Sequence, residues 1–284
     1  MHKHLIATFA TAAALAAPSL AHAACNEISS FPATIGSPGN YCLVADNTTA
    51  DSAEHTVEIN SHNVTLDCQG HTLSSTSASD AGSSAAIYAL NKHNVTIRNC
   101  RIMGGYTTGI QLQQANNGPN FNYYETISDN YIAGPYLYGI LAYGSVVEIT
   151  GNRVFDIGGQ ANTFAAGIRT GAGTGFAFHV IKDNVIAGTN SPYNNSFGIL
   201  SDKSIASLIT GNNVVAGGAN ASFRNFGIRL LSGNANRISG NQVIGSPQTN
   251  NTGVMSLDAT TACYDNFIRA NVKTSKCDAT FGNY

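Results

Sequence analysis

The sequence has little charge and no helical pattern. Asp, Glu, Lys and Arg make up 11% of the 284 residues, and the formal net charge is −2. Because Lys and Arg supply most contacts to nucleic-acid phosphates, the lack of a basic surplus argues against a nucleic-acid partner. Beyond the N-terminal segment, no stretch is apolar for long enough to span a membrane, and none has the periodicity of an amphipathic helix. We therefore expect a chain built from strands and turns.

The first 23 residues have the pattern of a secretory signal peptide. The segment MHKHLIATFATAAALAAPSLAHA has a short basic start, an apolar stretch and small residues at Ala21 and Ala23. Cleavage after Ala23 is expected, which places the mature chain outside the cell or in the periplasm. Cys25 follows closely, but His22 stands where a lipidation box needs an aliphatic residue. We expect an unlipidated, monomeric product without a membrane span.

A short motif, Ile-x-x-Asn-x-Ile/Val, recurs along most of the chain. Its Asn positions are 130, 152, 184, 212, 241 and 271, with steps of 22, 32, 28, 29 and 30 residues. A second motif, Gly followed by Ile or Val, runs in phase with the first at Gly109, Gly139, Gly167, Gly198, Gly227 and Gly253. Two motifs that share a period of about 29 residues indicate a repeat architecture.

Each repeat has the features of short strands. Apolar residues alternate at period two in runs rich in Val, Ile and Thr, and Gly, Asn, Ser and Asp separate these runs. One repeat cannot bury its apolar face alone, so the repeats are expected to stack as seven or eight coils of an all-β, single-chain parallel β-helix. Two columns should point inward: Ile110, Ile140, Ile168, Ile199, Ile228 and Val254, and Ile97, Ile127, Ile149, Ile181, Ile209 and Ile238. The motif Asn residues fit turns in the left-handed backbone region, with amides stacked from coil to coil.

This pattern resembles the right-handed parallel β-helix proteins of the pectate-lyase superfamily. NVTLDCQGHTL from Asn63 and NVTIRNCRIMGG from Asn94 look like the first coils of that group. The resemblance runs from about Ala24 to the C-terminus and implies the architecture without choosing an activity. The superfamily contains polysaccharide lyases, hydrolases, uronate epimerases and binding proteins, and a fold does not decide among them.

The mature chain keeps six cysteines, an even number for an oxidising compartment. We expect Cys25–Cys42 to tie an N-terminal cap at 24–61 and Cys263–Cys277 to tie a C-terminal cap at the end of the helix, which covers 62–284. Cys68 and Cys100 lie in equivalent regions of adjacent coils, so they form either a third bridge or two buried thiols. No Cys or His cluster has metal-ligand spacing, and no metal site is predicted.

One face of the predicted helix carries candidate functional groups. The residue after each motif Ile should point outward, which gives the column Gln111, Leu141, Arg169, Leu200, Arg229 and Met255. Two residues later, a second column runs Gln113, Tyr143, Gly171, Asp202, Leu231 and Leu257, with Lys203 next to Asp202. The loops that enter these strands carry Tyr136, Tyr138 and Tyr193. Because pyranose rings present C–H faces, aromatic rings beside polar groups predict a sugar-binding surface.

The resemblance implies a chemistry for this face. Several lyases of the superfamily neutralise a uronate carboxylate with cations and use Arg or Lys to remove the adjacent proton. On this basis Arg169, Lys203 and Arg229 are candidates for these roles and Tyr143 for the acid, while Gln111, Gln113, Tyr136, Tyr138, Tyr193 and Asp202 are candidates for substrate binding. The alternative is that these residues are solvated side chains on a sheet, with Asp202 paired to Arg169 or Arg229.

Two functional hypotheses follow. The first is a secreted enzyme that acts on a uronate-containing polysaccharide by β-elimination. Hydrolysis is disfavoured because Asp202 and Asp258 lie two coils apart, about 10 Å, at the outer limit for an inverting carboxylate pair. The second is a non-catalytic β-helix that binds glycan or a partner at a cell surface. No cofactor is predicted. Ca²⁺ is kept as an alternative, although no run of outward Asp residues marks a site for it.

Overall fold

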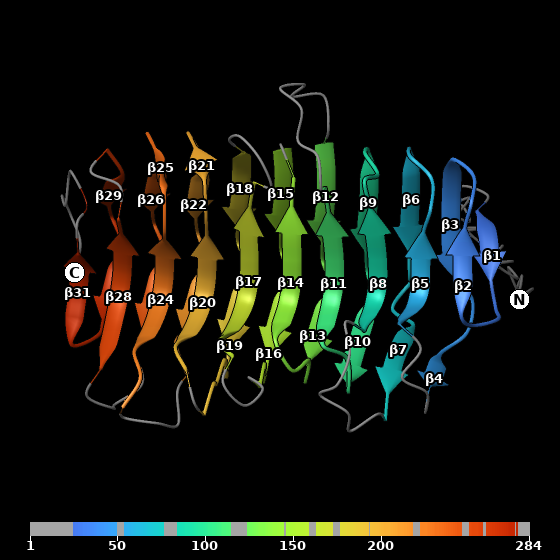
Figure 1. The fold of residues 1–284 in the computed structure, drawn as a ribbon, viewed down its shortest axis with the longest axis horizontal. Coiled ribbons are helices and arrows are strands. Elements are labelled where there is room, and N and C mark those ends of the chain that lie inside the picture. The colour runs from blue at the N-terminus through green and yellow to red at the C-terminus, as the bar shows by residue number, and fades with distance from the viewer. Residues whose placement is uncertain are drawn as a thin grey trace, which may run out of the picture.

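The chain forms an elongated stack of short parallel strands, with the two ends of the described chain at opposite ends of the stack (Figure 1). The computed structural model describes residues 25–49, 54–76, 84–114, 124–144, 146–158, 163–172, 177–192, 194–217, 222–245, 250–257, 260–275 and 277. The predicted signal peptide lies outside these residues. None of the described residues forms a helix that could span a membrane.

Three parallel sheets, named A, B and C here, run the length of the stack. Sheet A contains β1 (Asn26–Ile28), β3 (Gly39–Leu43), β6 (Val64–Asp67), β9 (Val95–Arg98), β12 (Tyr124–Ser128), β15 (Val146–Thr150), β18 (Phe178–Lys182), β22 (Leu208–Thr210), β26 (Arg237–Ser239) and β29 (Ala262–Tyr264). Sheet C contains β4 (Asn47–Thr49), β7 (Thr72–Ser75), β10 (Arg101–Gly104), β13 (Tyr131–Ala133), β16 (Arg153–Phe155), β19 (Val185–Ala187), β23 (Asn213–Val215), β27 (Gln242–Ile244) and β30 (Phe267–Arg269).

Sheet B faces the viewer in Figure 1 and completes each coil. It contains β2 (Ala33–Ile35), β5 (His55–Ile59), β8 (Ala85–Leu90), β11 (Thr108–Gln113), β14 (Tyr138–Tyr143), β17 (Ala165–Gly171), β20 (Ser196–Ser201), β24 (Asn225–Leu230), β28 (Asn251–Ser256) and β31 (Val272–Ser275). A minor pair, β21 (Ser204–Ile205) and β25 (Gly233–Asn234), lies beside the main sheets. A coil thus passes through A, C and B in turn, which is the predicted parallel β-helix.

Both predicted inward columns are confirmed. The strand register aligns Ile110 with Ile140 and continues through every member to Val254. The second column, from Ile97 to Ile238, is aligned in the same way in sheet A. Every side chain in these two columns is at most 1% exposed. Stacked Ile side chains therefore form one continuous apolar core, which supplies the main driving force for folding.

A column of buried asparagines lies beside this core, at the turn from sheet A to sheet C. Its members are Asn130, Asn152, Asn184, Asn212, Asn241 and Asn266, all at most 1% exposed. For each pair of successive members, the side-chain Oδ1 of the later Asn accepts hydrogen bonds from the backbone N–H and the Nδ2 of the earlier Asn, at 2.9–3.0 Å. The predicted coil-to-coil amide stacking is therefore confirmed.

Two details of the predicted asparagine turn were wrong. The last member is Asn266, whereas Asn271 is exposed. The left-handed backbone belongs to the residue before each Asn, for example Asp129 (φ 56°), Gly151 (φ 67°) and Asp183 (φ 56°). The physical reason is that the preceding residue makes the turn, which frees the Asn side chain to point inward and bond along the stack.

The motif glycines leave room inside each coil. A Cβ on Gly198 would lie 2.2 Å from a Val214 side-chain carbon and 2.6 Å from the Gly227 carbonyl oxygen, and Gly139, Gly167, Gly227 and Gly253 meet similar neighbours. The conserved geometry of the repeat therefore requires Gly where sheet B begins its inward column, because any side chain would enter the packed core.

All three expected disulfides form, including Cys68–Cys100, for which two buried thiols were the alternative. The segment assigned to an N-terminal cap, 24–61, supplies β1–β5, and these strands pair within the same three sheets. The stack therefore begins before the sequence motifs become recognisable.

Replacing Asn184 by Ala should lower the free energy of unfolding by at least about 2 kcal/mol, because the N–H of Asn152 and the carbonyl of Ile149 would each lose a buried partner. Denaturant titration of the folded protein measures this change. Asn213→Ala is the matched control. Asn213 is an exposed asparagine on β23, beside Val185 of the preceding coil, and its loss should change stability by less than about 0.5 kcal/mol. Equal losses in the two variants would mean that the amide column adds no stability.

Candidate functional site

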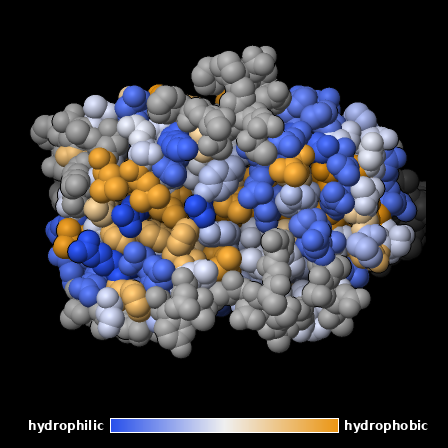
Figure 2. Space-filling view, in the orientation of Figure 1, coloured by the Kyte–Doolittle hydropathy of each residue, from blue (hydrophilic) through white to orange (hydrophobic). Residues whose placement is uncertain are grey.

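The outer face of sheet B carries the predicted column in the expected register. Gln111, Leu141, Arg169, Leu200, Arg229 and Met255 are aligned strand by strand. Arg169 and Arg229 are therefore two strands apart, or about 10 Å along the axis. Figure 2 shows apolar side chains gathered on this face toward the C-terminal end, with hydrophilic side chains set among them. The two arginines stand on different parts of this surface and have different neighbours.

Arg169 lies within a group of aromatic rings. Its guanidinium carbon is 4.9 Å from the ring centre of Phe164, 5.3 Å from that of Tyr138 and 5.4 Å from that of Tyr143. Its Nη1 also donates a 2.6 Å hydrogen bond to the Tyr138 hydroxyl. None of the ion pairs in the described part of the chain involves Arg169. The rings thus hold the guanidinium in place by cation–π contact and leave its charge without a carboxylate partner.

Arg229 packs on an apolar cluster instead. Its guanidinium carbon lies 4.5 Å from the ring centre of Phe226 and 5.6 Å from that of Phe197, and these two rings stack on each other at 5.3 Å. Phe197, Phe226 and Leu200 are at most 4% exposed. Burial lowers the pKa of Arg229 from its usual value, and its Nε is buried without a hydrogen-bond partner. Because the Arg229 side chain as a whole is only half-buried, the part of the guanidinium that reaches solvent is a candidate for binding an anion or hydroxyl.

Tyr143 leans across Gly171, the next residue in its column. A Cβ on Gly171 would lie 2.7 Å from the Tyr143 ring, so the glycine makes room for this ring. Burial raises the pKa of Tyr143, and the nearby Arg169 acts in the opposite direction. The phenol is therefore protonated at neutral pH and able to serve as a proton donor.

Three other predicted residues, Asp202, Lys203 and Tyr136, lie just outside the strands of sheet B. Asp202 follows β20 and accepts a 2.6 Å hydrogen bond from the Ser232 hydroxyl, and it forms no ion pair with either arginine among the described residues. Lys203 is exposed and lies in the turn, with a φ of 50°. Tyr136 precedes β14, and its backbone N–H donates to the Tyr106 carbonyl. Tyr193 lies outside the described residues.

The sequence interpretation named Tyr138 and Tyr143 but missed the phenylalanines that support the arginines. Phe197 and Phe226 each precede a motif Gly, as Tyr138 does, whereas the residues read as outward were those after the motif Ile. The repeated signal was a Tyr or Phe directly before Gly-Ile in three coils. Because the Gly turns inward, the residue before it points outward as well.

Two titratable side chains are buried away from this face. Glu125 accepts a hydrogen bond from Gln114 Nε2, and burial raises the pKa of this carboxyl to about 8. His179 is fully buried, and burial lowers its pKa to about 4. Among the described residues, no three His, Cys, Asp or Glu side chains gather in a way that could hold a metal ion.

Comparison with known proteins supports the fold. The family described as "Right handed beta helix region" matches residues 34–179, just over half of the chain. A search of curated proteins found no significant match. Among solved structures, the Dettilon tailspike protein gp208 aligns with 86% of this chain at 13% identity and a TM-score of 0.51, and this chain spans 53% of that one.

Two enzyme modules also align. The A-modules of the Azotobacter vinelandii mannuronan C-5 epimerases AlgE4 and AlgE6 each cover 87% of this chain at 13% identity, with TM-scores of 0.42 and 0.41. The alignments include 89% and 91% of those modules. These two alignments, with TM-scores below 0.5, carry no argument about this chain, and any function must be argued from the site itself.

The buried carboxyl of Glu125 gives a pH-dependent prediction. Because its pKa in the folded state is about 8, compared with an ordinary 4.5, the folded chain keeps a proton that the unfolded chain has lost. The free energy of unfolding should therefore fall as pH rises through this window and level off above it. Glu125→Gln should flatten this dependence in chemical denaturation measured across the window. An unchanged slope in the variant would assign the pH dependence to other groups.

Proposed function

This chain belongs to the right handed beta helix family, and we propose that the outer face of its sheet B binds a uronate-containing polysaccharide and cleaves it by β-elimination. The observation that carries this proposal is Arg169, whose guanidinium is framed by Phe164, Tyr138 and Tyr143 and has no carboxylate partner among the described residues. Aromatic rings offer stacking surfaces for sugar rings, and a positioned guanidinium can pair with a uronate carboxylate through two hydrogen bonds.

The proposed reaction requires three roles. Arg169 neutralises the carboxylate, which acidifies the neighbouring sugar C–H. A base, for which Lys203 is the candidate, removes that proton, and the electron pair forms a double bond as the adjacent C–O bond to the leaving sugar breaks. Tyr143, which is protonated at neutral pH, donates a proton to the departing oxygen. These groups come from three successive coils, which suits a polymer lying along the helix axis.

Arg229 supports a second contact with the same polymer. It lies about 10 Å from Arg169 along the axis, far enough to reach a different sugar unit. Its packing on Phe197 and Phe226 fixes the guanidinium, which reduces the entropy lost when a ligand binds. Export of the chain, as its N-terminal segment predicts, would place this surface where such polymers occur.

A glycan-binding protein without catalysis is the second candidate function. Arg229 favours this function. Its guanidinium is held against Phe197 and Phe226, which can position it for binding but cannot act as an acid or a base. The two functions differ in one measurement. A lyase releases an unsaturated product with ultraviolet absorbance from a uronate polymer, whereas a binding protein retains the polymer intact.

Arg169→Ala should reduce turnover of the responsive uronate polymer by at least about 100-fold, because transition-state charge would lose its stabilising cation. The assay is the initial rate of absorbance increase with each polymer of a uronate panel. Arg269→Ala is the matched control, since Arg269 is an exposed arginine on sheet C and should leave the rate unchanged.

If Arg269→Ala abolishes turnover and Arg169→Ala does not, the active face has been assigned to the wrong sheet. If the wild type cleaves no polymer of the panel but binds one through Arg169 and Arg229, the lyase chemistry is wrong and the binding function holds. Absence of both cleavage and binding would refute the proposed function.

A further inference from the structure

A separate concave surface lies at the turn between sheets A and C, away from sheet B. It is a cavity of about 590 Å³ whose lining includes Asp67, Gln69, Asn99, Arg101, Asp129 and Tyr131. An adjoining cavity of about 280 Å³ has Tyr41, Asp67, Gln69 and Arg98 in its lining. The two cavities share Asp67 and Gln69, so they lie side by side on the first coils, and the pair is called the cleft here.

A change in turn length creates this cleft. Four residues, 68–71, connect β6 to β7, whereas two residues connect β9 to β10 and β12 to β13. The extra residues include Gln69 and Gly70, which adopt positive φ angles of 52° and 84°. The longer turn therefore projects beyond the turns that follow it and forms a wall, while Asn99 and Asp129 from the shorter turns line the surface beside it.

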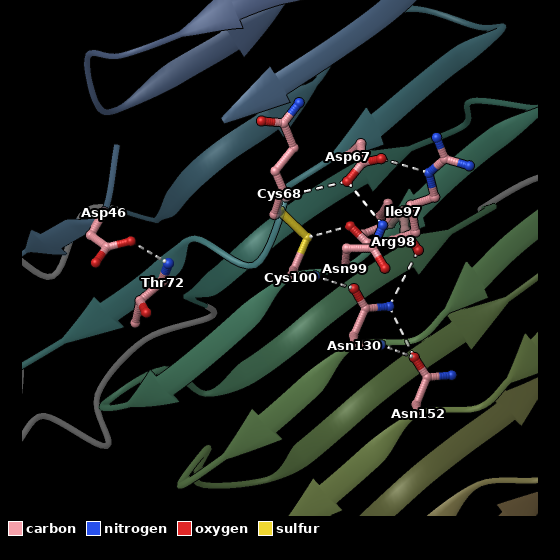
Figure 3. Close-up of a disulfide and its surroundings, with 11 residues drawn as sticks. Asp46, Asp67, Cys68, Thr72, Ile97, Arg98, Asn99, Cys100, Asn130 and Asn152 are labelled. Carbon is pink, nitrogen blue, oxygen red and sulfur yellow. Dashed lines mark hydrogen bonds and ion pairs between the residues drawn. A yellow bond between two sulfur atoms is a disulfide. The ribbon is translucent and has the colours of Figure 1, made fainter. Parts of the chain in front are cut away.

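The wall is tied to its neighbours by a disulfide and several hydrogen bonds, as Figure 3 shows. Its base is fixed by the Cys68–Cys100 disulfide. Asp67 accepts hydrogen bonds from the Gln69 N–H, the Asn99 Nδ2 and the Arg98 Nε. The far end of the turn is tied by Asp46, which accepts from the Thr72 N–H. A cleft that is already ordered loses little conformational entropy when a ligand binds.

The lining is polar, aromatic and close to electrical balance. Asp67 is paired with Arg98 at 2.9 Å, and Arg101 and Asp129 add one charge of each sign. The amide side chains of Gln69 and Asn99 supply both donors and acceptors. Arg101 lies over the Tyr131 ring at 5.1 Å, so this stacked pair borders one end of the lining, and Tyr41 lines the adjoining cavity. A ligand that fits this set has many hydroxyl groups, apolar ring faces and no net charge.

We propose that this cleft binds a neutral oligosaccharide, with sugar rings against the stacked Arg101–Tyr131 pair and Tyr41, and with hydroxyl groups hydrogen-bonded to Gln69, Asn99 and Asp129. The cavity volume lies within the usual range for small-molecule sites. This site is independent of the arginine face of sheet B, because it lies on a different turn and has no surplus of positive charge. The chain would then hold two carbohydrate sites of different chemistry.

The test is a binding titration of the oxidised wild-type protein with neutral oligosaccharides of several linkages, followed by calorimetry and ligand-observed NMR. Gln69→Ala and Tyr131→Ala should each weaken binding of the responsive sugar by about tenfold. Gln242→Ala and Phe267→Ala are the matched controls, since both residues are exposed on the outer side of sheet C near the other end of the stack and should leave affinity unchanged.

Three results would overturn the proposal: no neutral oligosaccharide binds, the cleft variants bind as well as the controls, or uronate oligosaccharides bind the cleft as tightly as neutral ones do. Arg169→Ala and Arg229→Ala separate this site from the proposed function. These two variants should keep full affinity for the neutral sugar even if no uronate polymer is bound or cleaved on sheet B.

Discussion

The buried asparagine column sets the register on which the rest of the structure depends. Apolar stacking is non-directional, so the isoleucine core alone would tolerate a coil that slips along its neighbour. Each Asn amide, in contrast, accepts from the backbone N–H of one specific residue in the preceding coil, as Asn184 does from Asn152. A slip would leave buried donors without partners, at a cost of about 1–3 kcal/mol each. Because the asparagine column keeps successive coils in register, the outward side chains of those coils are aligned as well.

A fixed register turns single residues into surfaces. Arg169, Leu200 and Arg229 are about 30 residues apart in the sequence, yet the register aligns them on consecutive strands. The same rule explains why local departures from the repeat matter. Phenylalanines before two motif glycines build the apolar support under Arg229, and two extra residues in the turn after Cys68 build the wall of the cleft. Both proposed sites depend on residues that differ from coil to coil, while the repeat supplies the frame that holds them.

The sequence was sufficient for the fold and for the outer columns, because both follow from period-two alternation and from the spacing of Gly and Asn. The cysteine pairs were also predictable, although for Cys68 and Cys100 the sequence left free thiols open. The phenylalanines under the arginines were not predicted, since strict alternation from the inward Ile199 would place Phe197 on the inner face as well. The alternation is interrupted at Gly198, where a Cβ would meet the Val214 side chain, and no local pattern encodes that interruption.

The cleft could not be read from the sequence for a different reason. NVTLDCQGHTL and NVTIRNCRIMGG align well by their apolar positions, but they differ in the number of residues between their strands. Composition shows Gln, Gly and Asn there, which any turn would contain. Only the stacked coils reveal that a longer turn stands next to shorter ones, and a cavity is a property of that difference rather than of either turn. In a solenoid, binding surfaces are therefore best sought by comparing successive coils. A feature shared by all coils stabilises the stack, whereas a feature present in one coil is not required for stacking and can bind a ligand.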